Sequence, residues 1–281
     1  MSIFDAILLA LFAGVTEIVP VSGTAHLFLM EKLLGLSSVS ADQRAYRGML
    51  YLGTALALLL FYRKPFFAML REFFVFIGAF RPHRRQRGVP FFRRLQFLAL
   101  MGSLPMLICF FLTGVLEQIE ASDYSLAFVS VTLSLNGLIL FFVGRSARAR
   151  RDLQQITLRD ALTIGSAQVL SLFPGISRSC VTLSASLVRE FDSESALEFS
   201  GLLGIPVFFA AGIRQLIVTS TQSERAISVW LLLAGMFLSA AAGLIALRIL
   251  SDQLSRRRPT GFSYWCWGAG ILSLILFLIS A

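Results

Sequence analysis

Two stretches of the chain read Gly14-Val-Thr-Glu-Ile-Val-Pro-Val-Ser-Gly-Thr-Ala-His26 and Leu172-Phe-Pro-Gly-Ile-Ser-Arg-Ser179. Each lies inside a long apolar region, yet each contains proline, glycine, hydroxyl groups and ionisable side chains. Proline and glycine interrupt helices, and non-helical backbone is tolerated at membrane depth only where it lines a cavity enclosed by protein. Because the two breaks carry complementary charges, they predict one shared polar pocket in an all-α integral membrane protein.

The composition supports this class. Hydrophobic residues make up 56% of the 281 residues, and the mean hydropathy is +0.77, above what soluble domains show. The first residues lack the basic region of a cleaved signal peptide, so we expect the first apolar stretch to be retained. The three cysteines, Cys109, Cys180 and Cys266, show no paired spacing, which favours a structural role over a disulfide or metal site.

The net charge of +9 comes largely from arginines in three loops, within 81–94, 145–159 and 256–258. No aromatic residues alternate with them as in single-strand binding proteins, so we expect no nucleic acid partner. Basic loops between apolar segments follow the positive-inside rule, which places all three in the cytoplasm beside anionic lipid.

Crossing the hydrocarbon core takes on the order of 20 apolar residues. We expect two re-entrant helical hairpins, at about 3–36 and 160–190, and an interfacial helix at Pro65 to Phe80, whose centre carries Arg71 and Glu72. Six transmembrane helices are predicted at roughly 46–62, 95–116, 125–143, 197–219, 227–250 and 262–280.

The two broken stretches also resemble each other. Asp5-Ala6 begins the first and Asp160-Ala161 the second, and 13–20 aligns without gaps to 167–174. Three crossings follow each hairpin, so the second copy would be inverted relative to the first. We therefore predict a single membrane domain, 1–281, with inverted repeats at about 1–143 and 160–281 joined by a basic cytoplasmic loop, 144–159.

Arg178 follows a Pro-Gly turn at which a helix is expected to restart. The N-terminus of a helix attracts anions, a guanidinium group can bind two phosphate oxygens, and Ser177 and Ser179 add hydroxyl donors. These features predict a phosphate-binding site. The alternative is an arginine paired with a structural carboxylate, with the serines as helix caps.

Glu17 and His26 lie on opposite sides of the Pro20 break, so a hairpin could bring both to its tip. The pair could perform general acid–base catalysis or nucleophilic attack by the imidazole. Glu17 could instead help to hold a divalent cation, and His26 could be hydrogen-bonded to a backbone carbonyl.

Three further hydroxyls, those of Ser22, Thr24 and Thr182, are candidates for phosphate binding. Ser22 and Thr24 could equally cap the restarted helix. Arg214 lies near the end of its predicted span, and we expect it to extend towards the membrane surface.

Together, Thr16-Glu-Ile-Val-Pro-Val-Ser-Gly-Thr-Ala-His26 and Pro174-Gly-Ile-Ser-Arg-Ser-Cys-Val-Thr182 resemble the motifs of the bacterial undecaprenyl-pyrophosphate phosphatases of the bacitracin-resistance type. The resemblance covers essentially the whole chain. It implies a multi-pass enzyme of the bacterial inner membrane that removes the terminal phosphate from a C55 polyprenyl pyrophosphate and so recycles the lipid carrier for peptidoglycan synthesis. It further implies catalytic roles for Glu17, His26 and Arg178, commonly with a divalent cation such as Mg²⁺ or Ca²⁺; a homodimer is a possible assembly.

The chain also differs from the family's pattern. Ala13 stands where an acidic residue or glutamine is usual, Gly23 replaces a serine, Arg47 stands near a usual glutamate, and Cys180 replaces a glycine. The change at Ala13 removes a candidate metal ligand or base. Two other functions therefore compete with the phosphatase: a transporter or flippase for polyprenyl phosphate, and a catalytically weak paralogue that binds lipid phosphate.

Overall fold

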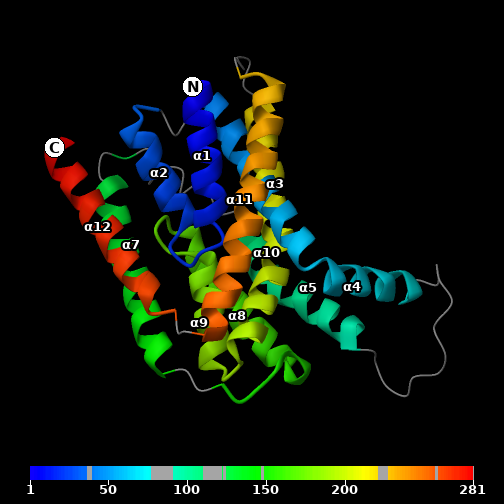
Figure 1. Cartoon of the computed structure of the whole chain (residues 1–281). Helices are drawn as coiled ribbons and strands as arrows, with labels where there is room; N and C mark the ends of the chain where they lie inside the picture. The colour runs from blue at the N-terminus through cyan, green and yellow to red at the C-terminus, as the bar shows by residue number, and fades with distance from the viewer. Residues whose placement is uncertain are drawn as a thin grey trace.

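A computed structural model describes residues 1–36, 40–76, 91–109, 122, 125–146, 149–220, 227–256 and 259–280. The described residues form helices joined by short connections, without a β-strand (Figure 1). The predicted basic residues at 81–90, Arg148, Arg257 and Arg258 lie outside this part of the chain, as do the ends of the predicted interfacial helix, 77–80, and of the predicted span 95–116. The helices are α1 Ile3–Thr16, α2 Gly23–Leu33, α3 Ala41–Phe61, α4 Arg63–Phe76, α5 Phe91–Cys109, α7 Ser125–Ser146, α8 Leu158–Ala167, α9 Arg178–Val188, α10 Ser193–Ser220, α11 Val229–Arg256 and α12 Gly261–Ser280, with 3₁₀ turns η2 Leu153–Gln155 and η3 Gln168–Leu172.

Five of the described helices, α5, α7, α10, α11 and α12, are long and apolar enough to cross a membrane. A sixth span is obtained if α3 and α4 count as one segment, although the two helices meet at an angle of 86°. α3 is not apolar enough alone, because its first two turns carry Asp42, Arg44 and Arg47. The prediction of an all-α integral membrane protein is confirmed, and the sharp bend before α4 agrees with a helix that leaves the direction of the spans.

Two helical hairpins enter the bundle from opposite ends (Figure 1). α1 and α2 form the first, and α8, η3 and α9 form the second. Both begin with the same local signal, a capping box in which a hydroxyl and an aspartate satisfy each other's backbone N–H groups: Ser2 with Asp5 before α1, and Thr157 with Asp160 before α8. The repeated Asp-Ala of the sequence thus marks equivalent helix starts.

The packing of the hairpins follows a reciprocal pattern. α1 packs on α11, and α8 packs on α5; α3 packs on both α10 and α11, and α7 packs on α12. α10 also packs on α5. If α3, α5 and α7 correspond to α10, α11 and α12, exchanging the two halves turns each of these pairings into another of them or into itself. The pattern agrees with two inverted repeats, whose boundaries at 1–143 and 160–281 stay a prediction.

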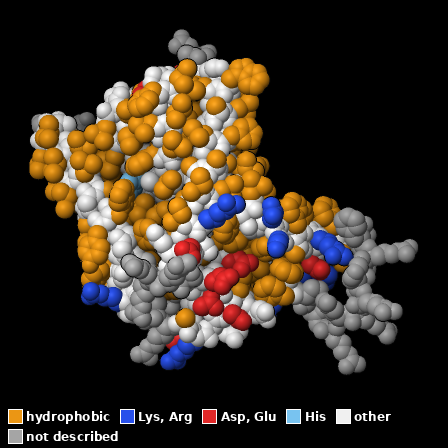
Figure 2. Space-filling view, viewed as in Figure 1, with side chains coloured by type: hydrophobic (Ala, Val, Ile, Leu, Met, Phe, Trp, Pro, Cys, Tyr) orange, Lys and Arg blue, Asp and Glu red, His pale blue; other side chains and the backbone are white. Residues whose placement is uncertain are grey.

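The surface is divided by polarity. Apolar side chains cover the upper part in Figure 2, whereas arginines and carboxylates gather towards the lower end. Large apolar side chains such as Phe209, Ile245 and Ile271 are exposed on α10, α11 and α12, as expected of helices that face lipid. The chain is therefore a multi-pass membrane protein.

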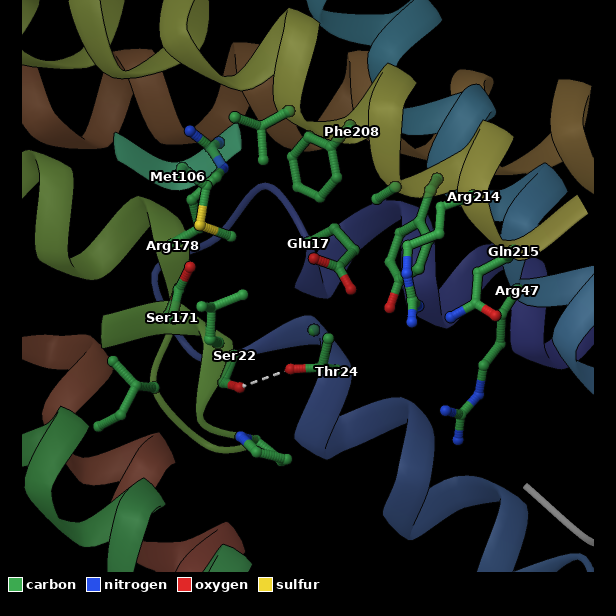
Figure 3. Close-up of a pocket in the computed structure, with 18 residues that line it drawn as sticks. Glu17, Ser22, Thr24, Arg47, Met106, Ser171, Arg178, Phe208, Arg214 and Gln215 are labelled. Atoms are coloured by element: carbon green, nitrogen blue, oxygen red, sulfur yellow. Dashed lines mark hydrogen bonds between the residues drawn. The ribbon is translucent and has the colours of Figure 1, made fainter. Parts of the chain in front are cut away.

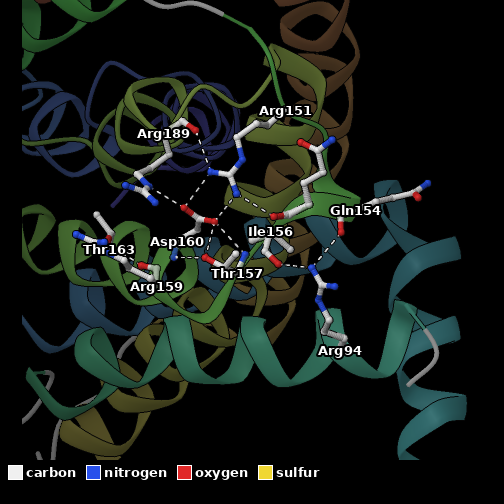
Figure 4. A network of polar contacts seen from close by, with 10 residues as sticks. Arg94, Arg151, Gln154, Ile156, Thr157, Arg159, Asp160, Thr163 and Arg189 are labelled. Atoms are coloured by element: carbon white, nitrogen blue, oxygen red, sulfur yellow. Dashed lines mark hydrogen bonds and ion pairs between the residues drawn. The ribbon is translucent and has the colours of Figure 1, made fainter. Parts of the chain in front are cut away.

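An aspartate at the base of the second hairpin is fully buried and accepts five hydrogen bonds, drawn in Figure 4. The carboxylate of Asp160 accepts two bonds from Arg151, one from Arg189 at 2.6 Å, and two from the backbone N–H and hydroxyl of Thr157. Burial alone would raise the pKa of Asp160, but these donors together hold it well below its usual range. The network fixes the start of α8 to the ends of the neighbouring segments.

Candidate functional site

The tips of the two hairpins meet at a cavity of about 150 Å³. Figure 3 shows side chains from both tips and from the surrounding helices pointing into it. The predicted shared pocket is thus present in the structure. The polar and charged residues that line it are Glu17, Ser22, Thr24, Arg47, Tyr51, Ser171, Ser177, Arg178, Arg214 and Gln215.

Arg178 is the first residue of α9, after a turn that only glycine can make. Gly175 has φ +106°, and a Cβ atom there would lie 1.9 Å from the Thr132 hydroxyl. The Arg178 guanidinium lies over the ring of Phe208 and donates to the Ser200 carbonyl at 2.8 Å, while its Nε has no partner. The side chain is thus held at a helix N-terminus with donor capacity left for an anion.

Glu17 reaches the cavity from the end of α1. Its carboxylate is buried, and Oε1 has no hydrogen-bond partner. A Cβ atom at Gly23 would lie 2.3 Å from the Glu17 carboxyl carbon. Gly23, which lacks the serine hydroxyl expected at this position, therefore makes room for this carboxylate.

The predicted hydroxyls separate into two groups. Ser22 and Thr24 line the cavity with their hydroxyls 3.3 Å apart, and the Ser22 side chain makes no capping bond to α2. Ser177 also lines the cavity, but its hydroxyl caps α9. Ser179 and Thr182 do not line it: Ser179 donates to the Val19 carbonyl, and Thr182 shares a 2.6 Å bond with a serine of α10. The structure therefore places Ser22 and Thr24 best for contact with a ligand.

His26 is not among the residues that line the cavity. Its Nε2 lies 2.8 Å from the indole nitrogen of Trp265, and its Nδ1 lies 2.8 Å from the Ser22 carbonyl. Because an indole N–H can only donate, Nε2 accepts and Nδ1–H donates. The imidazole is therefore neutral, and the lone pair on Nε2 is already used in the bond with Trp265. In this arrangement, His26 holds the backbone of Ser22, which has the unusual left-handed φ of 73°.

Asn136 of α7 connects the two hairpin tips. Its amide nitrogen donates to the Pro20 carbonyl at 3.0 Å, and its carbonyl oxygen accepts from the Ser177 backbone N–H at 2.8 Å. The side chain is fully buried. This residue was not predicted, because its only signal in the sequence is an amide within an apolar span.

Two further arginines were not predicted to lie in the pocket. Arg214 lines the cavity, so the prediction that it extends towards the membrane surface is wrong. α10 is rotated so that this side chain and that of Gln215 face the cavity (Figure 3). Arg47 also lines the cavity and forms a buried two-bond ion pair with Glu31 of α2.

A divalent cation would find few ligands here. Glu17 is the only carboxylate among the described residues that line the cavity, and Ala13 lies in an apolar cluster with Leu9 and Leu50 rather than on the cavity. The described residues contain no group of three or more His, Cys, Asp or Glu side chains that could hold a metal. Calcium takes about six to eight oxygen ligands, and three guanidinium groups would repel a cation. The residues present do not fit the predicted Mg²⁺ or Ca²⁺.

Comparison with known proteins finds relatives over nearly the whole chain. The family model described as "Bacitracin resistance protein BacA" matches residues 6–272. The chain is 31% identical to undecaprenyl-diphosphatase 3 of Bacillus cereus over 98% of both proteins. It is also 31% identical to the undecaprenyl-diphosphatase of Methanobrevibacter smithii over 97% of this chain and 96% of the relative. The enzyme of Carboxydothermus hydrogenoformans is 30% identical over 98% of both. With a match that spans nearly its whole length, the chain belongs to the bacitracin resistance protein BacA family.

Proposed function

We propose that this protein is an undecaprenyl-diphosphate phosphatase that recycles the C55 lipid carrier of peptidoglycan synthesis. The observation that carries the proposal is the meeting of Glu17 and Arg178 at one cavity between the hairpin tips. Arg178 and the N–H groups at the start of α9 would bind the diphosphate, and Ser22 and Thr24 would donate to its oxygens. Family membership and the names of the relatives support the same substrate.

The reaction adds one water molecule across the phosphoanhydride. The water oxygen bonds to the terminal phosphorus, and the bond from that phosphorus to the bridging oxygen breaks. Inorganic phosphate and the lipid monophosphate are released, and one water proton passes to Glu17 and then to solvent. Glu17 suits the role of general base because its Oε1 is buried without a partner. The predicted catalytic role of His26 stays a prediction, and here we assign it a positioning role through Ser22.

The proposal includes where the protein lies in the cell. We place the protein in the bacterial inner (plasma) membrane with the basic loops on the cytoplasmic side, as the positive-inside rule predicts. A homodimer stays a prediction, as does the divalent cation, and no step above depends on either.

The test is phosphate release by the purified protein from undecaprenyl diphosphate in detergent, with added Mg²⁺ or Ca²⁺ and with chelator. We expect release in the wild type and a strong loss in Glu17→Gln. If purified wild type releases no phosphate under any of these conditions, the proposal is wrong. Transport of polyprenyl phosphate across liposomes by such an inactive protein would favour the flippase.

Gly23→Ser tests whether this glycine makes room for the catalytic carboxylate. A side chain at this position has to displace the Glu17 carboxyl group, which would otherwise lie 2.3 Å from the new Cβ. We expect phosphate release to fall about tenfold, corresponding to roughly 1.4 kcal/mol of transition-state stabilisation. Gly268→Ser is a matched control, because a Cβ atom at Gly268 meets nothing within 4 Å. Higher activity in Gly23→Ser would show that the missing hydroxyl, rather than the room for the Glu17 carboxylate, limits phosphate release.

Asn136→Ala tests the connection between the tips. The substitution leaves the Pro20 carbonyl and the Ser177 N–H buried without their partner, at a cost of about 1–3 kcal/mol for each group. We expect loss of about 2 kcal/mol of stability in detergent and about tenfold lower phosphate release at saturating substrate. Ser134→Ala, which removes only a bond within α7, is the control. Unchanged activity in Asn136→Ala would show that the tips hold their positions without it.

A further inference from the structure

The cavity contains more positive than negative charge. Its lining includes three guanidinium groups, from Arg47 on α3, Arg178 on α9 and Arg214 on α10, and one carboxylate, Glu17. In Figure 3, Arg178 lies on one side of Glu17, and Arg47 and Arg214 lie on the other. Cations thus flank the carboxylate on both sides, where a bound diphosphate would extend.

Arg47 is fixed at its end of the cavity. Nε of Arg47 donates to Glu31 Oε1 at 2.8 Å, and Nη2 donates to Oε2. Only 7% of the Arg47 side chain and 1% of the Glu31 side chain are exposed. Glu31 is not part of the lining, so it balances one of the three cations while it holds the Arg47 guanidinium in position. Among the described side chains that line the cavity, guanidinium groups outnumber carboxylates by three to one.

This charge distribution suits an anion better than a metal ion. Charged donors at fixed positions stabilise phosphate oxygens most strongly in a site with little water. An added divalent cation would meet a single carboxylate and repulsion from the guanidinium groups. Arginine stays protonated under all conditions that proteins tolerate, so its charge is always present.

We infer that Arg47, Arg178 and Arg214 neutralise the diphosphate of the substrate in this chain, so that binding and hydrolysis proceed without a divalent cation. The inference rests on the proposed function. It assigns Arg47 and Arg214 to the end of the diphosphate opposite Arg178. The two arginines contact the phosphate oxygens and take no part in proton transfer.

The first experiment measures binding rather than turnover. The probe is a methylenediphosphonate analogue of a polyprenyl diphosphate, which cannot be hydrolysed, with affinity measured in EDTA and in Mg²⁺. We expect wild-type affinities within about twofold of each other, and about tenfold weaker binding in Arg214→Gln, as for loss of one charged hydrogen bond. Arg159→Gln, which removes an exposed arginine of α8, is the control. Loss of analogue binding in EDTA would overturn the inference.

Arg47 needs a paired substitution, because Arg47→Gln alone would leave Glu31 buried without its partner. In the double variant Arg47→Gln with Glu31→Gln, two amides replace the ion pair. We expect this variant to fold and to bind the analogue about tenfold more weakly in EDTA. Wild-type affinity in both this variant and Arg214→Gln would overturn the role of the two arginines.

Turnover and metal binding separate this inference from the proposed function. We expect phosphate release in EDTA at no less than half the rate in Mg²⁺, and no Mn²⁺ binding below millimolar concentration by electron paramagnetic resonance. Release that occurs only with added cation would overturn the inference and leave the phosphatase intact. Stoichiometric Mn²⁺ binding that Glu17→Gln abolishes would overturn it as well. Absence of release under every condition would instead reject the proposed function.

Discussion

Arg178→Lys is expected to lower phosphate release at least tenfold, and Arg178→Ala by about 100-fold to 1000-fold. Lysine keeps the charge but lacks the planar arrangement of donors that binds two phosphate oxygens. The Arg178 guanidinium lies over Phe208, donates to the Ser200 carbonyl and packs against Gly204. A lysine ammonium cannot make these three contacts at once. The measurement is the steady-state rate of phosphate release at saturating undecaprenyl diphosphate.

The control for this experiment is Arg159→Lys, the same exchange at an exposed position of α8. Thermal stability of both variants in detergent separates a misfolded protein from an inactive one. Wild-type turnover in Arg178→Lys would show that Arg178 acts as a structural charge, which was the alternative that the sequence left open.

Asp160→Asn is expected to lower the free energy of unfolding by about 3 kcal/mol, because removing one member of a buried ion pair leaves charges without compensation. The carboxylate is fully buried, whereas the side chains of Arg151 and Arg189 are 23% and 32% exposed. Asparagine keeps one acceptor but cannot satisfy both guanidinium groups and Thr157. Denaturation in mixed micelles of SDS and a mild detergent measures the difference, with the exposed Asp152→Asn as control.

Asp160 also makes the stability of the protein depend on pH. Asp160 lies outside the five candidate spans, and its pKa is lowered in the folded protein. A lowered pKa adds stability above the pKa of the unfolded chain, about 4, and this contribution is lost as the pH falls below that value. We expect wild-type stability to decrease below about pH 4 and the curve of Asp160→Asn to be flatter there. Curves of stability against pH that run parallel for the two proteins would show that Asp160 does not cause the loss of stability at low pH.

The sequence predicted the features that depend on local chemistry. Proline and glycine marked both hairpin tips, and the Pro-Gly turn placed Arg178 at a helix start. Six spans were predicted; among the described residues, five helices are long and apolar enough to cross a membrane alone, and α3 is so only together with α4. Complementary charge in the two breaks correctly predicted that Glu17 and Arg178 line one cavity. Each of these inferences needed only a short window of sequence.

The remaining features depend on helix rotation and on long-range contacts. Nothing local distinguishes Arg214, which faces the cavity, from an arginine that extends along its helix to the membrane surface. His26 has suitable chemistry for catalysis, but Trp265, more than 200 residues away, occupies its Nε2. The role of Asn136 follows only from two partners, Pro20 and Ser177, in different hairpins. Side-chain direction and partner identity are properties of the packed bundle, which hydrophobic periodicity does not specify.

The packing of α1 on α11 has a consequence for synthesis in the cell. α1 ends at residue 16 and α11 begins at residue 229, so the ribosome adds more than 200 residues before the first hairpin meets its main neighbour. Chains are made from the N-terminus at about 5–20 residues per second, which leaves the hairpin without that contact for at least about ten seconds. During this time, Gly14 and Ile18, which lie beside Gly243 of α11 in the folded protein, lack this contact. The insertion machinery or a chaperone has to shelter this segment, and truncation before α11 would make the nascent protein a target for membrane proteases.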